Sequence, residues 1–232
     1  DYGFRRRNGL PGYQSIIGSG KNATILHYVD GRDELVAGQI LLVDAGCELD
    51  GFTGDVTRSY PIPAPSCKPA FSRPQRLLYD LVLDTQLAAI AMVKPFVTIE
   101  EIHAQISHRL ASGLCAMGLL SGDPESAIES GALKRFFPHR SSHFLGLDVH
   151  DVGRYFPEGE PQRLLPGMVF TIEPGLYVQP DDPLGPDWQG IGIRIEDDIL
   201  VTATGHEVLT ADLPKHPDEL LKVVGTGVTF SV

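Results

Sequence analysis

Cysteine is scarce in this chain of 232 residues, with three widely spaced copies and no CxxC pair. That pattern predicts neither a disulfide framework nor a thiolate zinc site, and it favours a reducing compartment. No apolar run approaches the roughly 18 residues that a membrane span needs, so we expect no membrane partner. The sequence also lacks low-complexity tracts and internal repeats, which indicates a single domain over residues 1–232.

Basic residues are outnumbered, because 19 Lys and Arg stand against 30 Asp and Glu, a formal charge of −11. This is the wrong sign for capture of a phosphate backbone, so we expect no nucleic-acid partner. Hydrophobic residues make up 42% of the chain and charged residues 21%. These proportions are typical of a folded globular protein and exclude a disordered or coiled-coil one.

The first sixty residues alternate turn signals with short β-type runs, of which 40–43 predicts a buried strand that ends at Asp44. A Pro-rich hinge over 61–74 follows. Apolar residues then recur at helical spacing over 77–92, and Pro95 ends this predicted helix.

A second helix is predicted after Thr98, because Thr98 and Glu101 have capping-box spacing and an apolar stripe follows them. The pattern then returns to β, with expected strands over 169–172, 191–195 and 199–201. Strands, two helices and strands again, without strict βαβ alternation, predict an α+β domain whose helices pack on an antiparallel or mixed sheet.

Five acidic or histidine side chains stand within or beside the apolar strand runs. A buried carboxylate without a partner loses stability by desolvation or becomes protonated, so several in one core need cations to balance them. The alternative is that each residue ends a strand and faces solvent. The five are Asp44, Asp55, His143, Glu173 and Glu196.

This set suits divalent metal ions. Four carboxylates and one imidazole offer hard oxygen ligands with a single nitrogen, which favours Mn²⁺ over a structural zinc site. Zn²⁺ and Co²⁺ are the alternatives. Two ions would balance the four carboxylates, share and acidify a bridging water, and hold a tetrahedral oxyanion. The residues therefore predict a binuclear metal-dependent hydrolase.

Six segments closely resemble, in the same order, the catalytic domain of the Xaa-Pro aminopeptidase (aminopeptidase P) family. They are 25–28 (ILHY), 43–48 (VDAGCE), 54–58 (GDVTR), 142–151 (SHFLGLDVHD), 171–177 (TIEPGLY) and 193–198 (IRIEDD). The resemblance runs from about Gly18 to Pro214 and implies the pita-bread fold, shared with prolidases and methionine aminopeptidases. It also implies that the family's N-terminal domain, and the first helices and strand of its catalytic domain, are absent here.

Carried over by position, the family's metal ligands fall on the same five residues. The resemblance implies that Asp55 and Glu196 bridge two ions and that Asp44 chelates one. His143 and Glu173 would complete the coordination of the other. Glu173 would also be catalytic, because a carboxylate beside the attacking water can carry its proton to the leaving nitrogen.

Three histidines, His27, His139 and His150, match family positions around the substrate. Imidazoles suit that place because they donate to a peptide carbonyl or a tetrahedral oxygen. The resemblance implies catalytic and substrate-binding roles for all three, with His150 at the scissile region and His27 closing over it. His103 and His108 match no motif and are expected to be ordinary residues of a helix.

Arg194 and Tyr177 match family positions near the substrate, where a guanidinium orients a carboxylate and a phenol hydrogen bonds a ligand. We expect Arg194 to act in catalysis and both residues to bind substrate. Thr57 is expected to place its hydroxyl on Asp55. Arg140 departs from the pattern, because the family usually has glycine there, and we expect it to influence substrate preference.

The sequence thus predicts an aminopeptidase with two manganese ions that hydrolyses the bond between an N-terminal residue and a following proline. Its expected partners are such peptides, together with a second copy of the chain or the missing N-terminal part. A prolidase acting on Xaa-Pro dipeptides and a catalytically impaired binding module stay open, whereas methionine aminopeptidase fits the motifs less well. We expect a cytoplasmic protein, with the mitochondrion as the alternative location.

Overall fold

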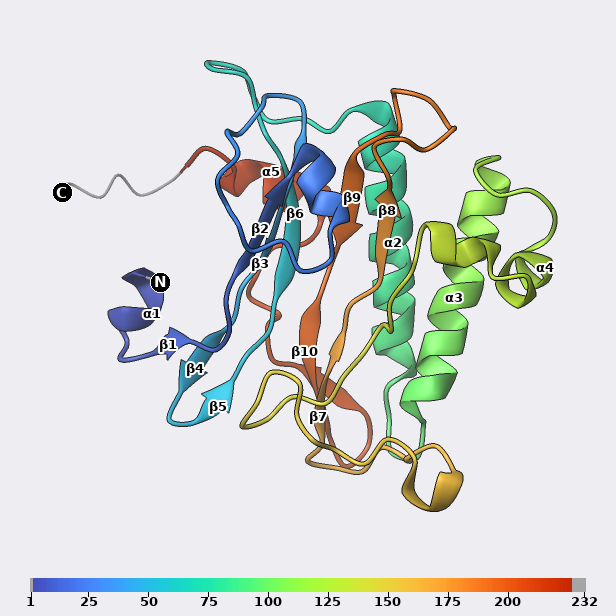
Figure 1. Cartoon of the computed structure of the whole chain (residues 1–232). Helices are drawn as coiled ribbons and strands as arrows, with labels where there is room; N and C mark the ends of the chain where they lie inside the picture. The colour runs from blue at the N-terminus through green and yellow to red at the C-terminus, as the bar shows by residue number, and fades with distance from the viewer. Residues whose placement is uncertain (1, 227–232) are drawn as a thin grey trace.

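The computed structural model describes residues 2–226. Figure 1 shows the strands with two long helices, α2 (Arg73–Met92) and α3 (Ile99–Ala116), packed against each other to one side. The shorter helices are α1 (Tyr2–Arg5), α4 (Pro124–Glu129) and α5 (Pro217–Val223), and 3₁₀ turns cover Gly20–Thr24, Ala132–Arg135 and Pro157–Gly159. The strands are β1 (Leu10–Pro11), β2 (Ile16–Ser19), β3 (Ile40–Asp44), β4 (Cys47–Leu49), β5 (Phe52–Thr53), β6 (Thr57–Pro61), β7 (Val169–Ile172), β8 (Gly175–Val178), β9 (Ile191–Arg194), β10 (Asp197–Val201) and β11 (His206–Val208).

Every strand pair within residues 2–226 is antiparallel, which is one of the two predicted arrangements, antiparallel or mixed. β3 is the centre of a sheet with β2 and β6, in which Asp44 lies opposite Ile16 and Thr57. In the second half of the chain β10 pairs with β7 and β11, and β8 pairs with β9. The halves meet where the Glu196 N–H donates to the Thr57 carbonyl at 3.1 Å.

Arg58 ties this junction to the C-terminal part of the chain. Its guanidinium donates to the Glu196 carbonyl at 2.6 Å and to the Asp197 carboxylate at 2.8 Å. It also donates to the carbonyls of Leu213 and Pro214 at 3.1 and 3.0 Å. Because the side chain is 4% exposed, these acceptors replace water around a buried cation.

The two long helices begin at capping boxes. The predicted box of Thr98 and Glu101 is confirmed, since the Glu101 N–H donates to the Thr98 hydroxyl at 3.1 Å. The prediction for α2 was wrong at its start, because Ser72 and Gln75 form a second capping box there. The Pro-rich hinge is therefore shorter than predicted, and Pro74 lies in the first helical turn, where its missing N–H has no partner to lose.

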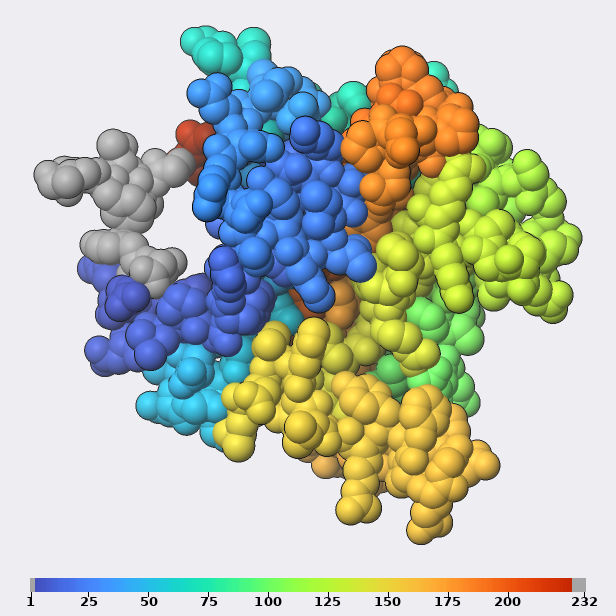
Figure 2. Space-filling view, viewed as in Figure 1, coloured from blue at the N-terminus to red at the C-terminus, as the bar shows by residue number. Residues whose placement is uncertain are grey.

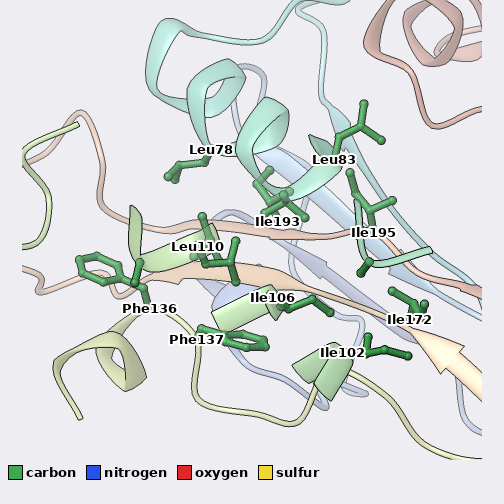
Figure 3. Packing of buried hydrophobic residues seen from close by; sticks show 14 of the residues in the cluster. Leu78, Leu83, Ile102, Ile106, Leu110, Phe136, Phe137, Ile172, Ile193 and Ile195 are labelled. Carbon is green, nitrogen blue, oxygen red and sulfur yellow. The ribbon is translucent and has the colours of Figure 1, made fainter. Parts of the chain in front are cut away.

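Apolar side chains of α2 and α3 pack on the strands of the second half (Figure 3). Leu78, Ile106, Ile193 and Ile195 are each 0% exposed, and burying such a side chain stabilises the fold by about 1.5–3 kcal/mol. This packing fixes the strands that flank Glu196. Within residues 2–226 no helix has the length and apolarity to cross a membrane.

Gly46 lets the loops next to Asp44 and Asp55 approach closely. A Cβ atom on Gly46 would lie 1.7 Å from the carbonyl oxygen of Gly54, far inside van der Waals contact. The Gly54 N–H meanwhile donates to the Cys47 carbonyl at 2.9 Å. Glycine at position 46 is therefore required for the separation that the two aspartates have.

Candidate metal and peptide-binding site

Strand ends carry the predicted ligands to one cavity of about 860 Å³. Its lining includes all five of Asp44, Asp55, His143, Glu173 and Glu196. Asp44 ends β3, whereas Glu196 lies between β9 and β10. Figure 2 shows a hollow between the blue segment near residue 27 and the yellow segment near residue 150, and residues of both segments line this cavity. A cavity of this size suits a small peptide.

His143 lies at the centre of the carboxylates. Its Nε2 is 3.4 Å from an oxygen of Asp55, 3.5 Å from one of Glu173 and 4.0 Å from one of Glu196. One ligand atom each from Asp55, His143 and Glu196 fall within 4.8 Å of one another. Three donors at such distances can face a single cation.

The charges of this cluster call for a cation. Burial raises the pKa of Glu173 to about 7, and that of Glu196 well above its usual range, with the neighbouring carboxylates adding to both. For His143 burial lowers the pKa, but Asp55 and Glu173 outweigh it and raise the value overall. Hard oxygens with one imidazole nitrogen fit a divalent metal ion, which would neutralise the carboxylates.

Tyr13 is a site residue that the sequence reasoning missed. Its hydroxyl donates to Asp44 at 2.5 Å and also contacts Asp55, so it lies between two predicted ligands. Burial, followed by the charges of Asp44 and Asp55, raises its pKa and keeps it a donor. Tyr13 lies in a loop between β1 and β2, where neither periodicity nor a charged residue in an apolar run could have pointed to it.

Asp198 is a second residue that the sequence reasoning missed, and it contacts the backbone of a predicted ligand. Its Oδ2 accepts from the Asp55 N–H at 3.1 Å, so it holds the backbone of a predicted ligand. Burial raises the pKa of Asp198 to about 7. The acidic run 196–198 was visible in the sequence, but nothing local distinguishes the ligand from the supporting aspartate.

Arg194 is 4% exposed, and its guanidinium N–H groups donate to other side chains of the protein. The guanidinium reaches Asp44 at 2.5 Å, the Tyr177 hydroxyl at 3.0 Å and the Thr57 hydroxyl at 3.1 Å. Thr57 in turn donates to Glu196 at 2.7 Å, so the prediction that it contacts Asp55 was wrong. Arg194 and Thr57 thereby join carboxylates from both halves of the chain.

Tyr177 is 0% exposed and is not among the residues that line the cavity, and its contact with substrate stays a prediction. Its hydroxyl lies 2.9 Å from Nε2 of His139. The other ring nitrogen of His139 donates to the Arg140 carbonyl at 2.6 Å, so Nε2 of the neutral ring accepts from Tyr177. Burial lowers the pKa of His139 to about 4, which keeps the ring neutral.

His27 and His150 line the cavity, as do His139 and His143. The His150 ring lies 4.4 Å from that of His143, and burial lowers its pKa, followed by the charge of His143. His108 pairs with Glu125 at the surface, as an ordinary residue would. His103 is closer to the site than expected, because its Nδ1 lies 2.9 Å from the hydroxyl of Ser141.

The sequence model of metallopeptidase family M24 matches residues 2–203. The chain therefore belongs to the metallopeptidase family M24, and the resemblance carried by the six segments is confirmed.

Among individual relatives, the Xaa-Pro aminopeptidase of Escherichia coli strain K12 is 44% identical over 210 residues, which are 90% of this chain and 46% of that protein. Aminopeptidase P from E. coli with the inhibitor Pro-Leu matches with a TM-score of 0.89 and 42% identity, covering 95% of this chain and 49% of that chain. Proline aminopeptidase P II from Yersinia pestis gives a TM-score of 0.91 and 42% identity, covering 97% and 51%. The pita-bread prediction is thus confirmed, and the chain spans about half the length of these relatives.

Proposed function

We propose that this chain is the catalytic part of a metal-dependent aminopeptidase that hydrolyses the bond between an N-terminal residue and a following proline. The observation that carries the proposal is the convergence of four carboxylates and His143 in one cavity. The names of the relatives, which are Xaa-Pro aminopeptidases, support the reaction class. A bond before proline needs a dedicated site, because it lacks an N–H and has restricted geometry.

Two divalent ions, Mn²⁺ by preference and Zn²⁺ or Co²⁺ as alternatives, are the proposed cofactors. Asp55 and Glu196 would hold both ions, Asp44 one of them, and His143 with Glu173 the other. Bound ions of this kind acidify a water molecule and polarise a carbonyl. A ratio of two ions per chain after dialysis against Mn²⁺, measured by elemental analysis, is the expected result.

Glu173 is the proposed proton carrier. Glu173 lines the cavity together with the other proposed ligands, and a carboxylate beside the attacking water can accept its proton and return it. One of its oxygens lies 3.5 Å from Nε2 of His143, which orients the carboxylate. Glu173 would move the proton of the attacking water to the nitrogen of proline, which leaves as a secondary amine.

The histidines divide into two proposed roles. His27 and His150 line the cavity and would donate hydrogen bonds to the peptide carbonyl and to the oxygen that becomes negative during attack. His139 would be a positioning residue, because both of its ring nitrogens are engaged by Arg140 and Tyr177. Arg194 would likewise position Asp44 and not touch the peptide.

The test is release of the free N-terminal amino acid, with Mn²⁺ supplied, from three peptides compared side by side. Turnover of an Xaa-Pro-Yaa tripeptide alone would support the aminopeptidase. Preference for an Xaa-Pro dipeptide would instead indicate a prolidase, and preference for Met-Ala-Yaa a methionine aminopeptidase. Absence of turnover with metal bound would point to a binding module. Location in the cytoplasm, or in the mitochondrion as for one relative from Arabidopsis thaliana, stays a proposal.

A further inference from the structure

Two arginines line the cavity, and they differ in what they can offer a ligand. Arg194 is buried and its guanidinium donates to three protein oxygens. Arg140 has a side chain that is 54% exposed, and the structure records an ion pair of one terminal nitrogen with Glu100. A guanidinium has five N–H donors in a planar fork. Arg140 is therefore the cation of this cavity that a dissolved peptide can reach.

The backbone that carries Arg140 is held in place by α3. Glu100 in the first turn of this helix binds the Arg140 side chain, and His103 one turn later lies 2.9 Å from the Ser141 hydroxyl. Ser141 is 1% exposed, and its carbonyl accepts from the Glu173 N–H at 2.9 Å. The loop that carries Arg140 thus contacts α3 through side chains and the Glu173 backbone through Ser141. These contacts fix the loop relative to the proposed proton carrier.

The lining of the cavity carries charges of both signs. The predicted metal ligands supply four carboxylates around His143, whereas Arg140 is a half-exposed cation whose recorded ion pair is with Glu100 of α3, outside that ligand set. A short peptide with free ends carries an ammonium group at one end and a carboxylate at the other. Attraction of the ammonium group to the acidic ligands would leave the carboxylate of the same peptide free to pair with Arg140.

We propose that Arg140 is a specificity-determining residue that binds a substrate carboxylate located beyond the proline. This inference rests on the proposed aminopeptidase function, since it assumes that the peptide amine lies at the acidic side. The carboxylate has two sources, the free C-terminus of a short peptide or the side chain of an acidic residue after proline. In both cases Arg140 offers its donors to two oxygens in the planar geometry that guanidinium and carboxylate share.

The test compares kcat/KM for matched peptides that differ only in this charge. Ala-Pro-Ala is compared with its C-terminal amide, and Ala-Pro-Asp-amide with Ala-Pro-Asn-amide. We expect the charged member of at least one pair to be favoured about three- to fivefold, the range of an exposed ion pair, and 0.5 M NaCl to reduce this ratio through screening. The pair that shows the preference identifies the source of the carboxylate.

Variants connect the preference to Arg140. Arg140→Gln is expected to bring the ratio to about one, and Glu100→Gln to increase it about twofold, because the competing carboxylate is removed. Arg76 is the matched control, as an exposed arginine paired with Asp80 on α2, and Arg76→Gln should keep the wild-type ratio. If Arg140→Gln does not fold, a double variant Glu100→Arg with Arg140→Glu preserves the ion pair and should invert the preference.

A ratio of one in the wild-type protein, or a preference that survives in Arg140→Gln, would overturn the inference. Failure of the proposed function gives a different result, because then neither member of a pair is hydrolysed. Equal turnover of the charged and uncharged members of both pairs retains the aminopeptidase and rejects the role of Arg140.

Discussion

Thr57 illustrates how much a single hydroxyl does in this site. It donates to Glu196 at 2.7 Å and accepts from Arg194 at 3.1 Å, so it links a predicted metal ligand to the arginine that holds Asp44. The side chain has the shape of valine, which cannot make either bond. A substitution that keeps the shape therefore isolates the hydrogen bonds.

We predict that Thr57→Val lowers the free energy of unfolding by about 1–3 kcal/mol, because it leaves buried polar groups of Glu196 and Arg194 without a partner. It should also weaken Mn²⁺ binding, since Glu196 loses the bond that orients it. Urea unfolding and metal titration measure the two effects. Thr57→Ser keeps the hydroxyl and should restore metal affinity, so equal losses in both variants would contradict the role.

Asp55 lies next to His143 and Glu196 in the cluster. We predict that Asp55→Ala removes bound Mn²⁺ and lowers turnover of the tripeptide at least a thousandfold, because the variant loses a carboxylate proposed to serve both ions. Elemental analysis and single-turnover kinetics are the measurements. Asp84→Ala changes an exposed aspartate of α2 and should leave both unchanged. A metal-free wild-type protein after Mn²⁺ addition would count against the ligand assignment.

At the scale of elements, the close approach of the loops that contain Gly46 and Gly54 determines the positions of Asp44 and Asp55. A Cβ on Gly46 would meet the Gly54 carbonyl oxygen at 1.7 Å, whereas a Cβ on Gly205 would have no heavy atom within 4 Å. Neither glycine has a positive φ, so the space around the added methyl group decides the effect of alanine at both positions.

We predict that Gly46→Ala lowers the free energy of unfolding by more than about 3 kcal/mol, as overpacking against backbone does, and moves Asp44 away from Asp55. Chemical denaturation and metal titration test the two parts. Gly205→Ala is the control, and its stability should lie within about 0.5 kcal/mol of the wild type. A Gly46→Ala variant with full metal affinity would show that the loops can separate without harm to the site.

The same elements show which features sequence patterns can predict. A strand is recognised by its apolar run, and a carboxylate at its end is conspicuous, so Asp44 and Glu173 could be chosen without a structure. The capping box at Thr98 is equally local. The bond from Thr57 to Glu196 joins residues 139 positions apart, and the contact of Tyr13 with Asp44 spans 31. Such pairings arise from tertiary packing and leave no local pattern.

At the scale of the whole molecule, the stability of the metal-free protein should depend on pH. Burial raises the pKa of Glu173 from 4.5 to about 7, so the folded protein retains a proton that the unfolded chain releases between these values. Stability falls with rising pH wherever the folded state binds more protons. Asp44, Glu196 and Asp198 have pKa values raised in the same direction and outnumber His139, whose pKa is lowered from 6.5 to about 4 and which has the opposite effect between these values.

We therefore predict that the free energy of unfolding of the metal-free protein decreases from about pH 4.5 to 7, by up to about 1.4 kcal/mol per pH unit for each proton retained. Mn²⁺ at saturating concentration should abolish this decrease and raise the melting temperature, because the metal replaces the proton. Urea unfolding over this pH range is the measurement. Glu173→Gln should flatten the slope without metal, and an unchanged slope would contradict the assignment.

Arg58 has a consequence for how this molecule is made on the ribosome. Its acceptors include Asp197, Leu213 and Pro214, which are synthesised about 140 to 155 residues later in the chain, as is Glu196. Until that segment is synthesised, Arg58 lacks these acceptors. Asp44 and Asp55 likewise lack Glu196, the last carboxylate of the cluster. Contacts of such long range slow folding, so we expect the site to assemble only after translation has passed residue 214.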